Sequence, residues 1–490
     1  MKSRHASLAA LITLALAACA VGPNYKRPTA PESQGYKELQ GWKPSEPKDD
    51  ADRGPWWSIY KDPVLDDLEK QIDISNQNIA AAAAAYLQAS ALANEAGAAF
   101  YPTLTVGLAG TRQGGNHGVS SSVGGSTVTP TGSGPQNSYN LQASSSWDLD
   151  LWGKIRRQHE SAIASAQASA AELASARLSA QASLAADYFS LRAADELQVF
   201  LDKTVEGFKR SLTITQNQYS VGVASRLDVI TAQTQLDTAE SQAVNVGVQR
   251  ATLEHAIAVL IGKAPSDFTL PPGDLTTVVP DVPVTLPSAL LERRPDIAAA
   301  ERQMAASNAQ IGVEKAGYYP DINFSGLLGY VGSAFGKLVT APNRVWSLGA
   351  DANENLFNGG ATHAAVSAAE AAYDESVANY RQSVLTAFQG VEDQLATLRI
   401  LGQQAVVQDE ATQDADKAAE IAMNQYRAGT VAYTTVVTAQ ATALSSHQTA
   451  LSLQQQRLVA SVTLIEDLGG GWSDAELPTS GDVGDGKATH

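Results

Sequence analysis

The chain has 490 residues, of which 44% are hydrophobic, 17% are charged and only 6% are aromatic. Alanine, serine, glutamine and leucine dominate long stretches such as residues 161–189, and so few aromatic side chains cannot fill several conventional globular cores. This composition favours long helices that touch along narrow seams. The net charge of −17 argues against nucleic acid and anionic membrane surfaces as partners, because clustered lysine and arginine bind both.

The first residues of the chain resemble a bacterial export signal. Lys2 and Arg4 precede an apolar run over residues 6–17, which is too short to span a bilayer and ends in small side chains. We therefore expect residues 1–18 to be a signal peptide that is removed on export. Its removal takes away two positive charges and makes the mature chain more acidic.

The signal ends at Cys19, the only cysteine of the chain, so no internal disulfide can form. A lone cysteine is usually a small buried hydrophobic residue. Here, however, the segment LAAC is similar to the lipoprotein signal, in which cleavage leaves the cysteine as a lipidated N-terminus. This resemblance implies N-palmitoyl and S-diacylglycerol groups on Cys19. Ala20 stands where an aspartate would retain a lipoprotein at the inner membrane, so the outer membrane is expected.

Four segments alternate between apolar and polar side chains, which is the period of a β-strand. We expect these strands at about residues 100–111, 138–151, 318–331 and 344–357. Each carries aromatic residues near its ends, which is typical of membrane strands with one lipid face and one polar lumen face. A soluble sandwich sheet would also alternate, but four strands in a chain of this length make a poor sandwich. The acidic residues expected to face the lumen are Asp148, Asp150 and Asp351.

Long helices are predicted after each pair of strands. No proline occurs between Pro135 and Pro265, or between Pro342 and Pro478, although the chain contains 20 of them. Proline breaks a helix interior, so both gaps are places where uninterrupted helices can run. Residues 154–219 alone would form a helix about 100 Å long at 1.5 Å per residue. No compact core needs a rod of this length.

The chain also repeats itself. The segment NQYSVGVASRLDVITAQ at residues 217–233 returns as NQYRAGTVAYTTVVTAQ at residues 424–440, an offset of 207. A repeat of this size indicates two structurally equivalent halves. The expected organisation is a signal peptide (1–18), a lipid-anchored N-terminal segment (19–62), a first repeat (63–262, hairpin turn near 219–228), a linker in an equatorial belt (263–286), a second repeat (287–469, hairpin turn near 426–435) and a C-terminal tail (470–490).

Four membrane strands cannot close a barrel by themselves. An unpaired backbone N–H or C=O in hydrocarbon costs several kcal/mol, and the smallest single-chain bacterial barrels have about 8 strands. The chain must therefore oligomerise with its strands in one shared wall. Two copies would give a barrel too narrow for a wide pore, so a homotrimer is the expected assembly.

Three short motifs occur in a fixed order: VGPNY at residues 21–25, WW followed by DP within residues 56–63, and LERRPDI at residues 291–297. Together with the duplicated strands and hairpins and the lipoprotein cysteine, they resemble the outer-membrane factors of the TolC and OprM type, including the efflux lipoproteins of NodT type. The resemblance covers essentially the whole mature chain. It implies a trimer with a 12-stranded membrane β-barrel that continues into a long α-helical barrel through the periplasm.

The same resemblance implies partners and a function. The partners are a periplasmic adaptor protein, a proton-driven inner-membrane pump and outer-membrane lipid. The implied function is that of a passive conduit for small molecules or drugs. Two alternatives remain open: the exit duct of a type I protein-secretion system, and a structural trimer that spans the periplasm without transport.

The two hairpin turns are the candidate functional residues of the helical part. Gly222 and Gly429 fit the left-handed residue that ends a helix, with Tyr219 and Tyr426 on the last turn. In the first copy, residues 225–228 also fit a capping box that starts the return helix. The resemblance adds a second role, because such turns lie at the periplasmic mouth, where the adaptor docks and the channel closes.

Carried over by position, Asp228 matches the gate aspartate of the family and Tyr426 its gate tyrosine. The second repeat departs from the pattern, because Thr435 stands where relatives often have an aspartate. The charged part of a gate must then come from Asp228, Arg226 or Arg427.

No catalytic pattern stands out in the sequence. The seven histidines lack metal-ligand spacing, and no nucleophile elbow or phosphate-binding glycine loop occurs. Asp148 and Asp150 imitate a catalytic carboxylate pair, but their alternation with leucines is explained more simply by a strand. We expect neither an enzyme nor a cofactor.

Overall fold

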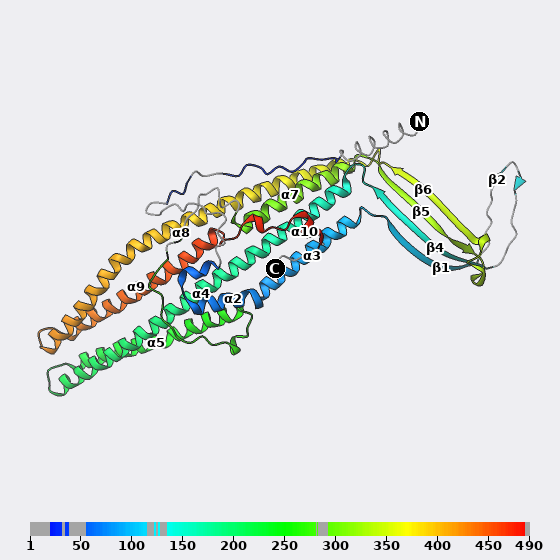
Figure 1. Cartoon of the computed structure of the whole chain (residues 1–490). Helices are drawn as coiled ribbons and strands as arrows, with labels where there is room; N and C mark the ends of the chain where they lie inside the picture. The colour runs from blue at the N-terminus through cyan, green and yellow to red at the C-terminus, as the bar shows by residue number, and fades with distance from the viewer. Residues whose placement is uncertain are drawn as a thin grey trace.

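The computed structural model describes residues 20–31, 35–38, 55–114, 122–123, 126–127, 135–280, 282 and 293–485. The expected signal peptide and Cys19 lie outside these residues. The described chain forms an elongated molecule with a β-sheet at one end and two helical hairpins that reach the other end (Figure 1).

The corresponding helices of the two hairpins have equal lengths. The first consists of α4 (Lys154–Ser220) and α5 (Arg226–Leu260), and the second of α8 (Ala361–Arg427) and α9 (Tyr433–Asp467). The outgoing helices have 67 residues and the return helices 35, and each boundary is displaced by 207 between the copies. The internal repeat is therefore exact through the hairpins, and it places both turns at the same end of the molecule (Figure 1).

The other elements complete the two copies. A 22-residue helix precedes each strand pair, α3 (Gln77–Ala98) in the first copy and α7 (Pro295–Ala316) in the second. The other elements in the described part of the chain are η1 (Trp56–Tyr60), α2 (Pro63–Ser75), β1 (Thr103–Gln113), β2 (Ser122–Val123), β3 (Ser126–Thr127), β4 (Gln136–Leu149), η2 (Pro265–Asp267), β5 (Asp321–Gly332), η4 (Phe335–Lys337), η5 (Ala341–Asn343), β6 (Arg344–Asn353), η6 (Asp474–Glu476) and α10 (Ser480–Asp485).

The main sheet has four antiparallel strands in the order β1-β4-β5-β6, so neighbours in the sheet follow one another along the chain apart from the small β2–β3 hairpin. Among the residues that the structure describes, the outer strands β1 and β6 each have one edge without a partner strand. Because the four directions alternate, β6 of one copy could pair antiparallel with β1 of another. Further copies of the chain could thus extend the sheet by pairing β6 with β1.

The helical part is held together by a core halfway along the hairpins. There, η1 and α2 pack on the middle of α4, with the rings of Tyr60 and Phe189 4.8 Å apart. The hydroxyl of Tyr188 donates to Asp62, whose other oxygen caps α2 by accepting from Val64. Each buried aromatic side chain removes a large apolar area from water, which alanine side chains cannot do.

A buried ionic network fixes the connection between the two copies. Arg192 and Arg250 both bind Asp195, with N···O distances of 3.0 and 2.7 Å. Arg192 also donates to the carbonyl of Pro271, and Asp195 accepts from the backbone N–H of Gly273. Each buried charge is therefore paired and hydrogen-bonded, which the interior requires. The segment after α5 is thereby bound to both helices of the first hairpin.

The N-terminal segment lies along the helices as an extended strap. The hydroxyl of Tyr25 donates to Glu301 on α7, and Arg27 donates to the hydroxyl of Tyr380 on α8. Burial and the neighbouring Glu301 raise the pKa of Tyr25 well above its usual range. Residues 20–31 thus contact elements that lie almost 300 residues or more away in sequence, and their path leads toward the junction of sheet and helices (Figure 1).

Candidate functional site

The four-stranded sheet has one polar and one apolar face, as the alternating pattern predicts. The register aligns Asp148 with Asn323 and Asn323 with Asp351, so that these three residues form one row across β4, β5 and β6. Asp148 and Asp351 are exposed and Asn323 is half-buried, and the amide of Asn323 donates to Asp148. The opposite face carries the apolar side chains Leu104, Val106, Leu108, Leu141, Trp147, Phe324, Leu328, Trp346 and Leu348.

Asp150 does not belong to the sheet, contrary to the expectation. β4 ends at Leu149, and the carboxylate of Asp150 accepts from the backbone N–H groups of Ile155 and Arg156 at the start of α4. The guanidinium of Arg156 binds the same carboxylate at 3.0 Å. Because the first N–H groups of a helix have no intrahelical partner, an acidic side chain there stabilises the helix start. Asp150 therefore caps α4 and is not a residue of the polar sheet face.

The two hairpin turns have the same backbone geometry. Gly222 has φ 79° and Gly429 has φ 73°, both in the left-handed region. In the first turn, the N–H of Val223 donates to the carbonyl of Gln218, and the second turn repeats this bond from Thr430. This is the Schellman arrangement, which satisfies the last carbonyls of a helix. Both turns require glycine for its backbone, because open space surrounds each one.

The return helices start differently in the two copies. In the first, Ser225 accepts from the N–H of Asp228, and Asp228 accepts from the N–H of Ser225, so the expected capping box is present. In the second, Ala432 occupies the N-cap and offers no side-chain hydrogen bond. The first return helix is therefore anchored by a carboxylate and the second is not.

A pair of buried tyrosines replaces the cap in the second copy. The rings of Tyr426 and Tyr433 lie 5.0 Å apart and pack on the first hairpin, in a cluster with Phe208 and Leu212. Burial raises the pKa of Tyr433 to about 12, with smaller contributions from Tyr426 and the negative charge of Asp228. The charge of Asp228 acts in the same direction on the pKa of Tyr426, after burial. The candidate gate residues of the two hairpins therefore lie near one another.

The other candidate residues are exposed. Tyr219 keeps 49% of its surface accessible, although its counterpart Tyr426 keeps only 6%. Arg226 is exposed, and Arg427 donates to Asn424 on its own helix. Within the residues that the structure describes, no contact joins either arginine to Asp228. Within one chain, Asp228 thus lies near enough to Tyr426 for its charge to act on the phenol, whereas the arginines and Tyr219 lie on the surface.

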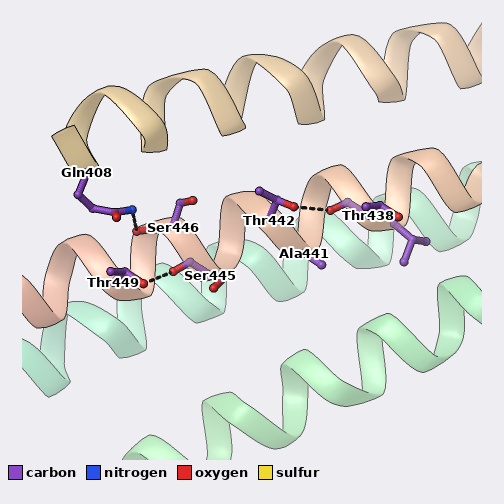
Figure 2. Close-up of a pocket in the computed structure, with 8 residues that line it drawn as sticks. Gln408, Thr438, Ala441, Thr442, Ser445, Ser446 and Thr449 are labelled. Carbon is purple, nitrogen blue, oxygen red and sulfur yellow. Dashed lines mark hydrogen bonds between the residues drawn. The ribbon is translucent and has the colours of Figure 1, made fainter.

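A groove between α8 and α9 was not foreseen from the sequence. It has a volume of about 600 Å³, and Figure 2 shows its polar lining on α9 below Gln408. Gln408 donates to the carbonyl of Ser446, and three threonines donate to carbonyls one turn earlier. The lining residues on α9 are Val437, Thr438, Ala441, Thr442, Ser445, Ser446 and Thr449. Their spacing of three and four residues places these small side chains on one face of α9, and this spacing is the only feature of the sequence that could have indicated the groove.

The described residues contain neither a metal-binding cluster nor a membrane-spanning helix. No group of three or more histidine, cysteine, aspartate or glutamate side chains is placed to hold a metal ion within the described ranges. None of the helices in this part of the chain is both long and apolar enough to cross a membrane.

Comparison with known proteins decides the family. A family model described as outer membrane efflux protein matches residues 68–263 and 286–470, which together make up more than half of the chain. The chain belongs to the outer membrane efflux protein family. The match confirms the resemblance to the TolC and OprM type, and with it the expected outer-membrane location and role in efflux. The family is one of efflux channels and is not known as an enzyme family.

Individual relatives span nearly the whole chain. The pyoverdine export outer membrane protein OpmQ of Pseudomonas putida is 31% identical over 490 residues, which cover 97% of this chain and 99% of that protein. The toluene efflux pump outer membrane protein TtgF of Pseudomonas putida is 29% identical over 486 residues, with coverages of 97% and 98%. The solved structure of the outer-membrane channel OprN matches with a TM-score of 0.84 at 28% identity and covers 93% of this chain and 100% of that one. The expected fold class is thereby confirmed.

Proposed function

We propose that this protein is the passive outer-membrane conduit of a tripartite system that exports small molecules. The observation that supports this best is the geometry of the chain: a sheet with one polar and one apolar face leads directly into hairpins 67 residues long. A polar face suits a water-filled lumen, and an apolar face suits lipid. The relatives named for toluene and pyoverdine export favour small solutes over proteins as cargo.

The conduit is a homotrimer with a 12-stranded barrel. The free edges of β1 and β6 must pair, because unpaired backbone groups in hydrocarbon cost several kcal/mol each. In this assembly Asp148 and Asp351 face the lumen. Cys19 carries the N-palmitoyl and S-diacylglycerol groups that anchor each chain. No catalytic activity is assigned, since the chain only guides solutes.

The hairpin turns form the inner mouth. Tyr219, Gly222, Tyr426 and Gly429 lie at the tips that meet the periplasmic adaptor, which connects the conduit to a proton-driven inner-membrane pump. Asp228 and Tyr426 close the mouth, and the exposed Arg226 and Arg427 supply positive charge from neighbouring chains. Two observations support this gate: Asp228 lies near the buried tyrosine pair, and its contacts to Ser225 leave it half-exposed.

Planar-bilayer recording tests the conduit. Purified protein should give discrete conductance steps, and a structural trimer without a lumen should give none. Complementation of a strain that lacks its own outer-membrane factor separates the remaining alternative. Restored resistance to small toxic solutes supports efflux, whereas restored secretion of a protein substrate without restored resistance would assign the chain to a type I secretion system.

Adaptor docking has its own test. A photoreactive amino acid at Gly222 or Gly429 should capture the adaptor in cells, and the same group at Gly114, which follows β1 at the opposite end of the molecule, is the control. Equal capture from both ends would contradict docking at the turns.

A further inference from the structure

The apolar face of the sheet contains a hollow that the conduit function does not use. It has a volume of about 560 Å³ and lies on three strands, β4, β5 and β6. Trp147 and Phe324 form one side, with ring centroids 6.5 Å apart, and Leu348 forms the other. Gly326 forms the floor, because a Cβ atom there would lie 3.0 Å from the Ser145 hydroxyl and 3.4 Å from Leu348. We call this hollow the Gly326 notch.

The notch lies at the helical end of the sheet. Trp147 donates its ring N–H to the carbonyl of Phe100, just before β1, and the exposed Tyr101 follows. Tryptophan and tyrosine mark the level of the lipid headgroups at the ends of membrane strands. A second aromatic group, which includes Tyr139 and Phe335 at 5.5 Å, marks the opposite level. The notch therefore opens into hydrocarbon just beyond the inner headgroup level.

The N-terminal strap ends close to the same place. The N–H of Val21 donates to the carbonyl of Trp152 at 2.9 Å, and Ala20 lies directly against Gly153. The ring of Trp152 stacks on Tyr319 at 4.8 Å, and its N–H donates to Pro320. The strap is thus fixed where β4 ends and β5 begins. Ala20 therefore lies at the base of the two strands that carry the notch, and Cys19 is the residue that precedes it in the sequence.

The distances suit a fatty acyl chain. Phe324 follows Pro320 by four residues, so the notch begins about 13 Å above the base at roughly 3.3 Å per residue. An acyl chain that spans one leaflet is about 15 Å long, half of the hydrocarbon core, so it covers the distance from the base and its methyl end reaches the notch. We propose that the Gly326 notch seats one acyl chain of the lipid carried by Cys19. This inference rests on the lipid anchor proposed above.

The covalent attachment to Cys19 explains why this acyl chain would occupy the notch in preference to free lipid. Moving an acyl chain from bilayer into an apolar hollow gains little, because lipid tails are equally apolar. A free phospholipid must also lose translational freedom, which an acyl chain already attached to the protein has lost. Seating would fix the strap against the sheet and set the depth of the barrel relative to the inner leaflet.

Photocrosslinking tests the proposal. Cells are grown with palmitate that carries a diazirine near its methyl end, the membrane is irradiated, and peptides joined to the N-terminal peptide are identified by mass spectrometry. The expected adduct joins the acyl chain on Cys19 to the peptides with Trp147 or Phe324. In Gly326→Leu, which fills the notch, the seated arrangement can no longer form, and this adduct should fall about tenfold, which corresponds to a preference of about 1.4 kcal/mol for the seated position. The matched control is Gly110→Leu on the same face at the far end of β1, and it should leave the yield unchanged.

The outcomes separate the two proposals. An N-terminal peptide without acyl groups would refute the anchor and the notch together. Acylated Cys19 with adducts spread evenly over the apolar face, or unaffected by Gly326→Leu, would refute the notch alone. A Cys19→Ser protein exported with a non-lipoprotein signal is the remaining control. If labelled phospholipid reached Trp147 in it as strongly as the acyl chain does in the wild type, the occupant would be bulk lipid, and the proposal would be wrong.

Discussion

Asp228 has two roles that substitutions can separate. Its carboxylate accepts hydrogen bonds from the backbone N–H and the hydroxyl of Ser225, so it caps α5. Its negative charge also helps to raise the pKa of the tyrosines of the neighbouring hairpin. Asp228→Asn keeps an oxygen for the cap but removes the charge. Ser225→Ala weakens the cap but keeps the charge. Asp228→Ala removes both.

The expected effects differ in size. Losing a helix cap costs about 1 kcal/mol, which raises the open population about fivefold if the open tip is the less ordered state. Losing a hydrogen bond to a charged group between chains costs about 1.5–3 kcal/mol, or about 10- to 150-fold in the same population. If the charge closes the gate, Asp228→Asn should open the channel almost as far as Asp228→Ala, and Ser225→Ala should open it least.

Two assays read the gate. Single-channel recording in planar bilayers gives the conductance of each variant, and entry of a large antibiotic into cells reports the aperture in vivo. The order of the variants is the decisive result. Wild-type conductance in Asp228→Asn together with increased conductance in Ser225→Ala would show that the cap, and not the charge, holds the tip closed.

Three other predictions concern stability, all measured by thermal unfolding of the purified protein in detergent. Gly262→Ala should destabilise the folded protein far more than Gly222→Ala. Both glycines have positive φ, for which a side chain costs about 1–2 kcal/mol. Only at Gly262, however, would the new Cβ atom lie 2.1 Å from the carbonyl oxygen of Ser75. Burial raises the pKa of Glu69 from 4.5 to about 9. The contribution of the protonated carboxyl to folding stability is therefore complete below pH 4.5 and is lost as pH rises toward 9, because the unfolded chain ionises first. Glu69→Gln should consequently stabilise the protein by about 3 kcal/mol at pH 7 and by almost nothing at pH 4. Equal gains at both pH values would contradict this. Tyr433→Phe should lessen the loss of stability between pH 10 and 12, since the raised pKa of about 12 makes folding unfavourable for the ionised phenol.

The backbone of this fold is largely readable from the sequence. Hairpin lengths follow from the absence of proline, the turns from glycine, and the strands from their period of two. The offset of 207 holds at every hairpin boundary, because no insertion separates the two copies there. By contrast, α3 and α7 start 218 residues apart, since the loops that join the strands differ in length.

Side-chain roles were harder to predict, because they depend on which helix lies opposite. Asp150 continues the alternation of β4 in sequence, yet the strand ends before it and the carboxylate turns to the N–H groups of α4. Glu69 looks like an ordinary surface residue of α2, but neither of its oxygens has a partner among the described residues. The Gly326 notch needs three strands in register, a condition that no single segment encodes.

The different burial of Tyr219 and Tyr426 indicates how the two hairpins pack against neighbouring chains in the assembly. Tyr426 is buried because the first hairpin of the same chain covers it, and Tyr219 is exposed because no second hairpin lies on its side. In a closed ring of alternating hairpins, the second hairpin of the next chain occupies that side. Tyr219 should therefore resist nitration in the assembled protein and react once detergent separates the chains, whereas Tyr101, outside the helical part, should react equally in both. Strong nitration of Tyr219 in the intact assembly would mean that the ring is open at the first turn, and that the two turns differ in function as well as in sequence.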